Sequence, residues 1–295
     1  MLNHQKFSVN STDQSVWEAT ALSARIFLWY TRKVPNHPFK LRLAKFFARL
    51  FFSKGLILSN PYGAKILVNA LVTDYIHHTL IYTGVWEPKS LALAIKLMSN
   101  GGTFLDVGSH FGLYTCAIGV LEGVDCICVE PSPKMFINMT NNIQLNPKVK
   151  ANLVHAALSA LPTIKSFGIP SQGNTGTARI LINEQTFDQF WLACVTLDDI
   201  LDIFNQHKIQ LMKIDVEGYE MEVFKGIKWL KSYRPQNIIV ECDDSLLKRT
   251  GSSLFDLLNF FSNQHYDAFT VEGNTLDVSQ LSNLPESNIW FKSKF

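Results

Sequence analysis

Two acidic side chains, Asp106 and Glu130, stand at the ends of neighbouring apolar segments, "TFLDV" at 103–107 and "CICVE" at 126–130. Such near-continuous apolar segments are typical of parallel strands buried on both faces. Open α/β sheets bind ligands beyond the carboxyl ends of their strands, and an acid ending the second strand can accept hydrogen bonds from ribose hydroxyls. We therefore expect Glu130 to bind a ribose. The alternative is that both acids cap the sheet as solvated carboxylates.

The turn after the first segment, "DVGSHFG" at 106–112, resembles a nucleotide-binding turn that lacks a glycine. A dinucleotide site needs G-x-G-x-x-G, whose second glycine lets the backbone approach a pyrophosphate. Counted from Gly108, the second and third glycine positions hold His110 and Leu113, and the Gly-Lys-Ser/Thr of a P-loop is absent. The turn therefore predicts a nucleoside ligand without phosphates. S-adenosylmethionine, with an adenosine, an amino-acid end and a sulfonium cation, fits that description.

A second group of acids follows the segment "LMKIDVEG" at 211–218. Alternation along a strand places Lys213 and Asp215 on one face, and we expect Asp215 to lie beside the turn that follows Asp106. Methyl transfer to a hydroxyl needs alignment and usually a general base. Asp215 is our first candidate for the base, with a structural pairing to Lys213 as the alternative, because a buried lysine must be paired.

Two further acids lie close by in this arrangement. Glu217 either contacts substrate or cofactor or caps the helix that begins near Gly218, and Glu241 ends the next strand, where functional and structural roles both stay open. Together with Asp215 these carboxylates have the oxygen chemistry of a divalent-cation site. We treat that as a minor alternative and predict no metal.

Other polar residues have less specific surroundings. His155 lies at the end of the strand expected at 152–157 and more often fits a sheet-end residue than a base, although the backbone at Ala156 lies where an adenine edge is expected. His77 and His78 fit packed or solvated residues. Asn174, in the loop "GNTG", fits either a turn or a contact with the acceptor.

These residues need a scaffold of strands and helices that alternate from residue 60 onward. A hairpin is expected at 59–69 and a strand-rich insertion at 158–196. The pattern predicts core strands at 103–107, 126–130, 152–157, 209–215 and 237–242, with helices at 90–102, 113–122, 132–145, 198–206, 219–231 and 252–263. Repeated strand–helix units predict a mostly parallel sheet with helices on both faces. The last two strands, near 266–274 and 288–294, are expected to be antiparallel.

The N-terminal part predicts two helices, at 16–34 and 39–54, separated by "PNHP". In the second helix the basic residues Arg42, Lys45 and Arg49 share one face, and the opposite face is apolar, formed by Leu43, Phe46, Phe47, Leu50 and Phe51. The simpler interpretation packs the apolar face on the domain. The other interpretation, peripheral contact of residues 39–54 with an anionic membrane or a partner, stays open because that face is rich in phenylalanine.

Composition narrows the class of protein. The chain has 295 residues, a net charge of +2, 47% hydrophobic and 18% charged residues, which does not favour nucleic-acid binding. Its five cysteines lie mostly in apolar segments without CxxC spacing, as expected for reduced core thiols. Because the N-terminus lacks a signal-peptide pattern and no segment reaches about 18 apolar residues, we expect a cytoplasmic protein.

Several motifs in consistent order carry a family resemblance, and "KIDVEGYE" at 213–220 is the most specific of them. With it stand "FLDVGSHFGLYT" (104–115), "VEPSPKMFINMTNNIQLN" (129–146), "VTLDDIL" (195–201) and "RPQNIIVE" (234–241). The set resembles the FkbM-type methyltransferases, class I S-adenosylmethionine-dependent enzymes that mostly methylate oxygen in natural products and saccharides. The resemblance covers about residues 72–245 and leaves residues 1–58 outside it.

This resemblance implies a class I (Rossmann-like) α/β fold with a seven-stranded, mostly parallel sheet, a C-terminal antiparallel hairpin and an N-terminal helical extension (1–58) before the catalytic domain (59–295). Taken together, the resemblance and the strand ends predict these cofactor residues: Glu87, Asp106, Gly108, Ser109, His110, Gly112, Glu130, Pro131, Ser132, His155, Ala156 and Asp215. Asp106 and the glycines would shape the methionine side, whereas Pro131 and Ser132 would border the adenine. Ser109-His110 departs from the family's common Ala-Asn and leaves the role of His110 open.

The predicted function is S-adenosylmethionine-dependent O-methylation of a hydroxyl on a sugar or natural-product-type molecule. Asp215, Glu217, His110 and Glu241 are the candidate catalytic residues. An alternative, favoured by the His110 departure and the phenylalanine-rich helix, is a methyltransferase-like binding or regulatory protein. A nicotinamide oxidoreductase is disfavoured by His110 and Leu113, which would crowd a pyrophosphate.

Overall fold

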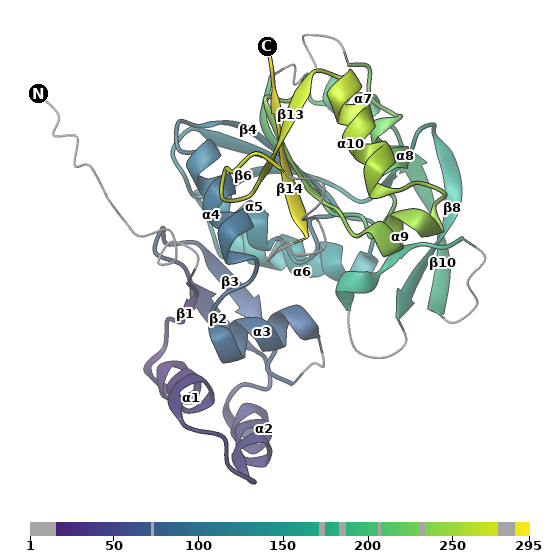
Figure 1. The fold of residues 1–295 in the computed structure, drawn as a ribbon. Helices are drawn as coiled ribbons and strands as arrows, with labels where there is room; N and C mark the ends of the chain where they lie inside the picture. The colour runs from purple at the N-terminus through teal and green to yellow at the C-terminus, as the bar shows by residue number, and fades with distance from the viewer. Residues whose placement is uncertain are drawn as a thin grey trace, which may run out of the picture.

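A seven-stranded mixed sheet forms the centre of the molecule (Figure 1). The computed structural model describes residues 16–71, 74–170, 175–182, 187–205, 208–229, 234–276 and 287–295. Along the sheet the strands are β13 (Tyr266–Thr270), β14 (Asn288–Ser293), β12 (Asn237–Glu241), β11 (Ile209–Ile214), β4 (Gly102–Val107), β5 (Val124–Val129) and β6 (Lys150–Val154). The five strands from β12 to β6 are mutually parallel, and β14 is antiparallel to both of its neighbours. The expected parallel core and antiparallel tail are both present.

Helices cover both faces of this sheet, as the strand–helix alternation predicts. One face packs against α4 (Pro88–Leu97), α5 (Leu113–Gly119) and α6 (Pro133–Gln144). The other packs against α7 (Leu197–Ile203), α8 (Glu220–Phe224), α9 (Asp244–Arg249) and α10 (Leu254–Asn263). Side-chain caps begin several of these helices: the hydroxyl of Ser132 caps α6, and Thr196 forms a capping box with Asp199 at α7.

Three expected element boundaries are wrong. The helix expected at 219–231 is only the five-residue α8, and α9 was not predicted. The strand expected at 152–157 ends at Val154, because Ala157–Leu158 forms β7 in a different sheet. The helix expected at 16–34 begins only at Leu22.

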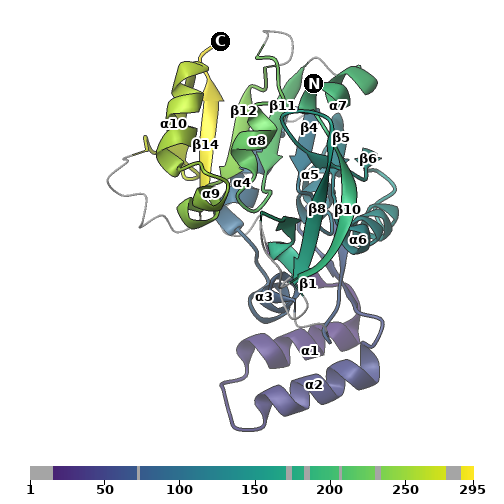
Figure 2. The same cartoon turned by 90° about the vertical axis from the view of Figure 1, so that its right-hand side faces the viewer.

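The insertion at 158–196 is strand-rich, as expected, and forms a second sheet with strand order β7-β10-β8-β9 (Figure 2). Its long antiparallel pair is β8 (Thr163–Pro170) with β10 (Phe187–Val195), and β9 (Arg179–Ile180) joins the edge of β8 after a short 3₁₀ helix at Thr175–Thr177. This sheet lies at the end of the large sheet where the site is formed.

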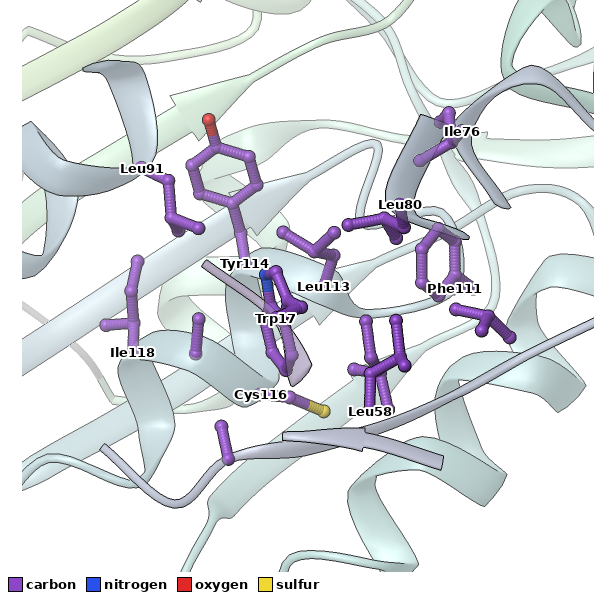
Figure 3. Close-up of a cluster of buried hydrophobic side chains, with 14 of the residues drawn as sticks. Trp17, Leu58, Ile76, Leu80, Leu91, Phe111, Leu113, Tyr114, Cys116 and Ile118 are labelled. Carbon is purple, nitrogen blue, oxygen red and sulfur yellow. The ribbon is translucent and has the colours of Figure 1, made fainter. Parts of the chain in front are cut away.

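The N-terminal part also contains a small sheet. The expected hairpin is present as the antiparallel pair β2 (Leu56–Ser59) and β3 (Lys65–Val68), but it begins at Leu56 and not at residue 59, and β1 (Glu18–Ala19) adds a third strand. The expected domain boundary between residues 58 and 59 falls inside β2. Figure 3 shows why this part is continuous with the rest: Trp17 and Leu58 pack with Leu113, Cys116 and Ile118 of α5.

Two helices, α1 (Leu22–Lys33) and α2 (Lys40–Phe51), lie outermost beside α3 (Tyr75–Thr83). We expected the apolar face of α2 to pack on the domain, and this interpretation is wrong. The helix is buried through Ala44 and Ala48 instead, whereas Phe46 and Leu50 are 59% and 60% exposed. Small residues allow α2 to approach α1, and the large apolar side chains point away. No helix in the described part of the chain is long and apolar enough to cross a membrane.

Candidate functional site

A cavity of about 420 Å³ lies at the carboxyl ends of β4, β5, β11 and β12. Its walls come from the turns after these strands, from the start of α3 and from the insertion sheet. Nine of the expected site residues line it: Glu87, Gly108, His110, Glu130, Pro131, Ala156, Asp215, Glu217 and Glu241. The strand-end acids read from the sequence are therefore brought to one place.

Glu130 is held rigidly at the floor of this cavity. The backbone N–H of His110 donates to its Oε2 at 2.7 Å, and that of Ser132 donates to its Oε1 at 2.7 Å. The carboxyl group thus joins the turn after β4 to the turn after β5. Burial raises the pKa of Glu130 to about 8, although the two backbone bonds lower it. The interpretation of Glu130 as a solvated sheet cap is wrong, because the residue is only 5% exposed.

The turn after β4 crosses closely over the turn after β11. Gly108 has φ +79°, and a Cβ at this position would lie 1.8 Å from the carbonyl oxygen of Asp215. The N–H of Asp215 also donates to the carbonyl of Val107 at 3.0 Å. Glycine is required here by both the left-handed backbone and the close approach.

The departing pair Ser109-His110 fits this turn without distorting it. His110 has φ 51°, a region in which asparagine and histidine are both enriched among non-glycine residues. The hydroxyl of Ser109 donates to the carbonyl of Asp106 at 2.7 Å and so stays inside the turn. Burial lowers the pKa of His110 to about 4, so its ring is neutral at pH 7.

Five of the expected cofactor residues lie outside the cavity lining, namely Asp106, Ser109, Gly112, Ser132 and His155. The carboxylate of Asp106 accepts from the hydroxyl of Thr115 at 2.6 Å, and burial raises its pKa to about 6. His155 contacts the carbonyl of Pro131 at 3.1 Å and stacks on Phe136. These residues fix the turns that carry Gly108, His110 and Pro131, and their direct contact with cofactor stays a prediction.

Glu87, Asp215, Glu217 and Glu241 form an acidic wall of the cavity, and a buried lysine lies against it. Nζ of Lys213 lies 2.9 Å from Oδ2 of Asp215 and 3.9 Å from Oε2 of Glu87, and 4.8 Å from the ring centre of Tyr114. The hydroxyl of Tyr114 donates to Oε2 of Glu87 at 2.6 Å. The expected pairing of Lys213 with Asp215 is present, and Glu87 joins it.

The acids of this wall hold their protons differently. Burial tends to raise the pKa of Asp215, but Lys213 and a hydrogen bond with Glu241 outweigh it and hold the pKa below its usual range. The negative charge of Asp215, with burial, raises the pKa of Glu241 well above its usual range. Burial raises the pKa of Glu217 to about 8, with Asp215 adding to the shift. At pH 7 Asp215 is therefore ionised, and Glu241 holds its proton more tightly than an ordinary glutamic acid does.

The model of the Methyltransferase FkbM domain matches residues 106–268, more than half of the chain. This chain belongs to the FkbM methyltransferase family. The match includes the turns that carry Glu130, Asp215, Glu217 and Glu241, which is where the cavity lies.

A hexuronic acid methyltransferase, AglP of Haloferax volcanii, is 28% identical to this chain over 141 residues, which cover 48% of the chain and 56% of AglP. The chain thus spans about half the length of this curated relative.

Among solved structures, an O-methyltransferase from Bacillus cereus in complex with SAH is 12% identical, with a TM-score of 0.39 over 70% of this chain and 80% of that one. TomG of Streptomyces achromogenes, an O-methyltransferase of tomaymycin synthesis in complex with SAM, is 9% identical, with a TM-score of 0.40 over 75% and 87% of the two chains. Both scores are low, and no conclusion rests on them.

S-adenosylmethionine is the cofactor of this FkbM methyltransferase domain, and the cavity suits it. Glu87, Glu130, Asp215, Glu217 and Glu241 surround the space, and carboxyl groups favour a sulfonium cation over a pyrophosphate. The N–H of His110, which would face a pyrophosphate in a dinucleotide site, donates to Glu130 instead. The volume also lies in the range of small-molecule pockets. These observations speak against the nicotinamide alternative.

The same acids do not by themselves make a metal centre in the FkbM domain. Carboxylate oxygens of Glu87, Asp215 and Glu241 lie within 4.8 Å of one another. The ammonium of Lys213, however, already lies against two of these three groups and supplies positive charge there. We assign no metal ion to them.

Sequence reasoning missed residues that position the site or line it. Oε1 of Glu220 accepts from the N–H of Val216 at 3.2 Å and of Gly218 at 3.1 Å, so Glu220 rather than Glu217 holds this turn. The start of α8 shows no cap by Glu217, whose φ is 55°. Tyr75, Trp86 and Arg179 also line the cavity. Of these missed residues, only Glu220 had a signal in the sequence, because it belongs to the motif "KIDVEGYE". The contact predicted for Asn174 lies outside the described residues.

Proposed function

We propose that this protein transfers a methyl group from S-adenosylmethionine to a hydroxyl of a saccharide acceptor. The observation that carries the proposal is that Glu130 and the acids Asp215, Glu217 and Glu241 line a single cavity. One side has the hydrogen-bond acceptor expected for a ribose, and the other has acids that can orient and deprotonate a hydroxyl. The strand order β13-β14-β12-β11-β4-β5-β6 supports a class I methyltransferase fold.

The cofactor half of the cavity is assigned to residues of two turns. Glu130 would accept hydrogen bonds from the ribose, while the backbone at Gly108 and His110 would face the amino-acid end. Pro131 and Ala156 line the adjoining wall, where the adenine is expected. Bound there, S-adenosylmethionine supplies an electrophilic methyl group on its sulfonium sulfur.

Among the three acids of the acceptor half, Glu217 has the proton affinity of a general base. Efficient bases have a pKa near the working pH. Asp215 is held ionised by Lys213 and is a weak base, and the charge of Asp215 raises the pKa of Glu241 well above its usual range. The ionised form of Glu217, whose pKa is about 8 in the free protein, would accept the hydroxyl proton as the oxygen–methyl bond forms and the sulfur–methyl bond breaks. Asp215 then orients the hydroxyl as a hydrogen-bond acceptor.

The acceptor side of the cavity is supported as a saccharide site by its aromatic edge. Tyr75 and Trp86 line it with their rings in edge-to-face contact, 5.8 Å between centroids. Apolar walls with a few polar groups are usual for small-molecule sites, and aromatic faces pack against the C–H face of sugar rings. Arg179 lines the same side near Glu217 and would face an acidic sugar. AglP, named as a hexuronic acid methyltransferase, points to the same acceptor class.

The alternative of a non-catalytic binding protein receives no support from His110. Its main-chain conformation suits histidine as it suits asparagine, and its N–H still supports Glu130. The motif departure therefore gives no reason to expect a damaged pocket.

The test is methyl transfer from labelled S-adenosylmethionine to an oligosaccharide pool rich in uronic acids, with products identified by mass spectrometry. We expect one methyl group per modified sugar, placed on oxygen. Glu122→Gln, an exposed acid away from the cavity, is the matched control for Glu217→Gln. Cofactor binding without any methylated sugar, lipid or small-molecule product would instead support the binding protein.

A further inference from the structure

The helical hairpin formed by α1 and α2 exposes large apolar side chains on both helices. On α2 they are Leu43, Phe46, Phe47, Leu50 and Phe51, and on α1 they are Leu22, Ile26 and Trp29, which is 61% exposed. Figures 1 and 2 both place the hairpin at the end of the molecule farthest from the large sheet. Large apolar side chains exposed in such number on two neighbouring helices mark an interaction site.

The charges of the same region all have one sign. Between Ala19 and Leu71 stand nine of the chain's 27 Lys and Arg residues and none of its 25 Asp and Glu residues. The rest of the chain therefore carries a net negative charge. On α2 the exposed residues Arg42, Lys45 and Arg49 flank the apolar face. The hairpin offers an apolar face within a basic field.

We propose that the helical hairpin docks on the surface of a membrane that contains anionic lipids. Helices with Phe, Leu and Trp on one face and Lys and Arg beside it lie in the headgroup region, and each basic residue adds attraction to anionic lipid. At 12 residues each, α1 and α2 are too short to span a bilayer and suit its surface instead. A second copy of the chain is disfavoured because two such basic hairpins repel each other.

Docking would bring the cavity close to the lipid surface through α3. At one end of α3, Nη2 of Arg32 donates to the carbonyl of Leu80 at 2.8 Å, and Nε donates to Ile81 at 3.0 Å. At the other end, Tyr75 and Ile76 line the cavity. One helix thus joins the docking surface to the site, and the geometry points to acceptor sugars carried on membrane lipids. This last step rests on the proposed function; docking itself does not.

Vesicle flotation tests the docking without cofactor or acceptor. The full chain is mixed with phosphatidylcholine vesicles, with or without phosphatidylglycerol, and the floated fraction is measured. We expect binding that requires phosphatidylglycerol and weakens in high salt. Phe46→Ser/Leu50→Ser should lower the binding at least about tenfold. Ile137→Ser/Phe255→Ser, which changes equally exposed apolar residues on α6 and α10, should leave it unchanged.

A charge pair of variants completes the design. Lys45→Gln/Arg49→Gln should also weaken binding, whereas Lys148→Gln/Lys150→Gln, exposed but distant, should not. The proposal is overturned if the wild-type chain stays in the aqueous fraction, binds neutral vesicles equally well, or loses as much binding in the control variants. Light scattering that shows a dimer dissociated by Phe46→Ser/Leu50→Ser would make a second copy the occupant and would overturn it too. None of these outcomes depends on methyl transfer.

Discussion

The cavity and the helical hairpin both reverse the usual distribution of side chains, but they do so in opposite directions. The cavity and the turns around it bury carboxyl groups such as Glu130 and Glu220, and the hairpin exposes Phe46 and Phe51. Each buried acid has partners within the described chain: backbone N–H groups hold Glu130 and Glu220, and Lys213 holds Asp215. In the described part of the chain, the exposed aromatic rings of α2 pack mainly on one another, as in the stacked pair Phe47 and Phe51, and Phe51 also contacts the buried Phe52.

The two regions would therefore gain binding free energy from different sources, electrostatic attraction in the cavity and burial of apolar area on the hairpin. In the cavity, protein groups hold several acids together, and burial raises the pKa of Glu130 and Glu217 to about 8, so a cationic ligand would restore their charged forms. On the hairpin, apolar area is in contact with water, and burying it would gain about 25 cal/mol for each Å². A ligand for the first site is small and positive, and a ligand for the second is broad, apolar and negative.

Removal of the base should give the largest effect and tests the catalytic side of this contrast. Glu217→Gln should lower kcat by about 10²- to 10⁴-fold with little change in cofactor affinity. Because the base must be ionised, wild-type kcat should rise with pH through the pKa of Glu217 in the cofactor complex and then level off, and the sulfonium should hold that pKa below the value of about 8 in the free protein. The variant should lose this rise, measured at saturating cofactor so that Glu130 does not contribute. An equal fall in affinity would place Glu217 with the cofactor instead.

Removal of the buried lysine should be the most costly change to stability. Lys213→Met leaves Asp215 and Glu87 without their cation and should lower the free energy of unfolding by about 3–5 kcal/mol. Urea denaturation measures this. Lys248→Met removes an exposed pair with Asp244 and should cost less than about 1 kcal/mol. Equal small losses in both variants would show that the acidic wall needs no internal cation.

A smaller loss is expected at the ribose side. Glu130→Ala should weaken binding of S-adenosylmethionine by about 1.5–3 kcal/mol, because hydrogen bonds donated by the ribose hydroxyls to the carboxylate are lost. Titration calorimetry with the cofactor and with S-adenosylhomocysteine measures the change. Glu130→Gln should lose less, since its amide keeps one acceptor oxygen. Unchanged affinity in Glu130→Ala would remove this residue from the cofactor site.

The sequence allowed good predictions where one pattern has one physical meaning. Apolar strands ending in acids must be buried and must meet at one edge, so the positions of Glu130, Asp215 and Glu241 followed from spacing alone. Pairing of Lys213 followed from the cost of a buried charge. Tyr114 and Arg179 could not be found in this way, because their contacts join parts of the chain that only the folded topology brings together.

The hairpin shows the limit of periodicity. Apolar residues at helical spacing predict an amphipathic helix, but they do not identify the partner that covers its apolar face. In α2 the tertiary contact uses Ala44 and Ala48, whose small size was not counted as a signal, and the large residues of the same helix face outward. The short β1 was missed for a related reason: its two residues pair with β2, a distant segment.

The smallest expected effect is the loss of stability when exposed apolar residues of α2 are replaced, and it tests whether these residues form a docking surface or belong to the core. Phe46→Ser and Leu50→Ser should each change the free energy of unfolding by no more than about 0.5 kcal/mol, since exposed side chains contribute little to folding. Leu80→Ala, in the buried cluster shown in Figure 3, should cost about 2–5 kcal/mol. Chemical denaturation of the three variants decides the point. Losses of core size at Phe46 or Leu50 would mean that these residues are covered within the chain in solution, and the hairpin would then have no free apolar face to offer a membrane.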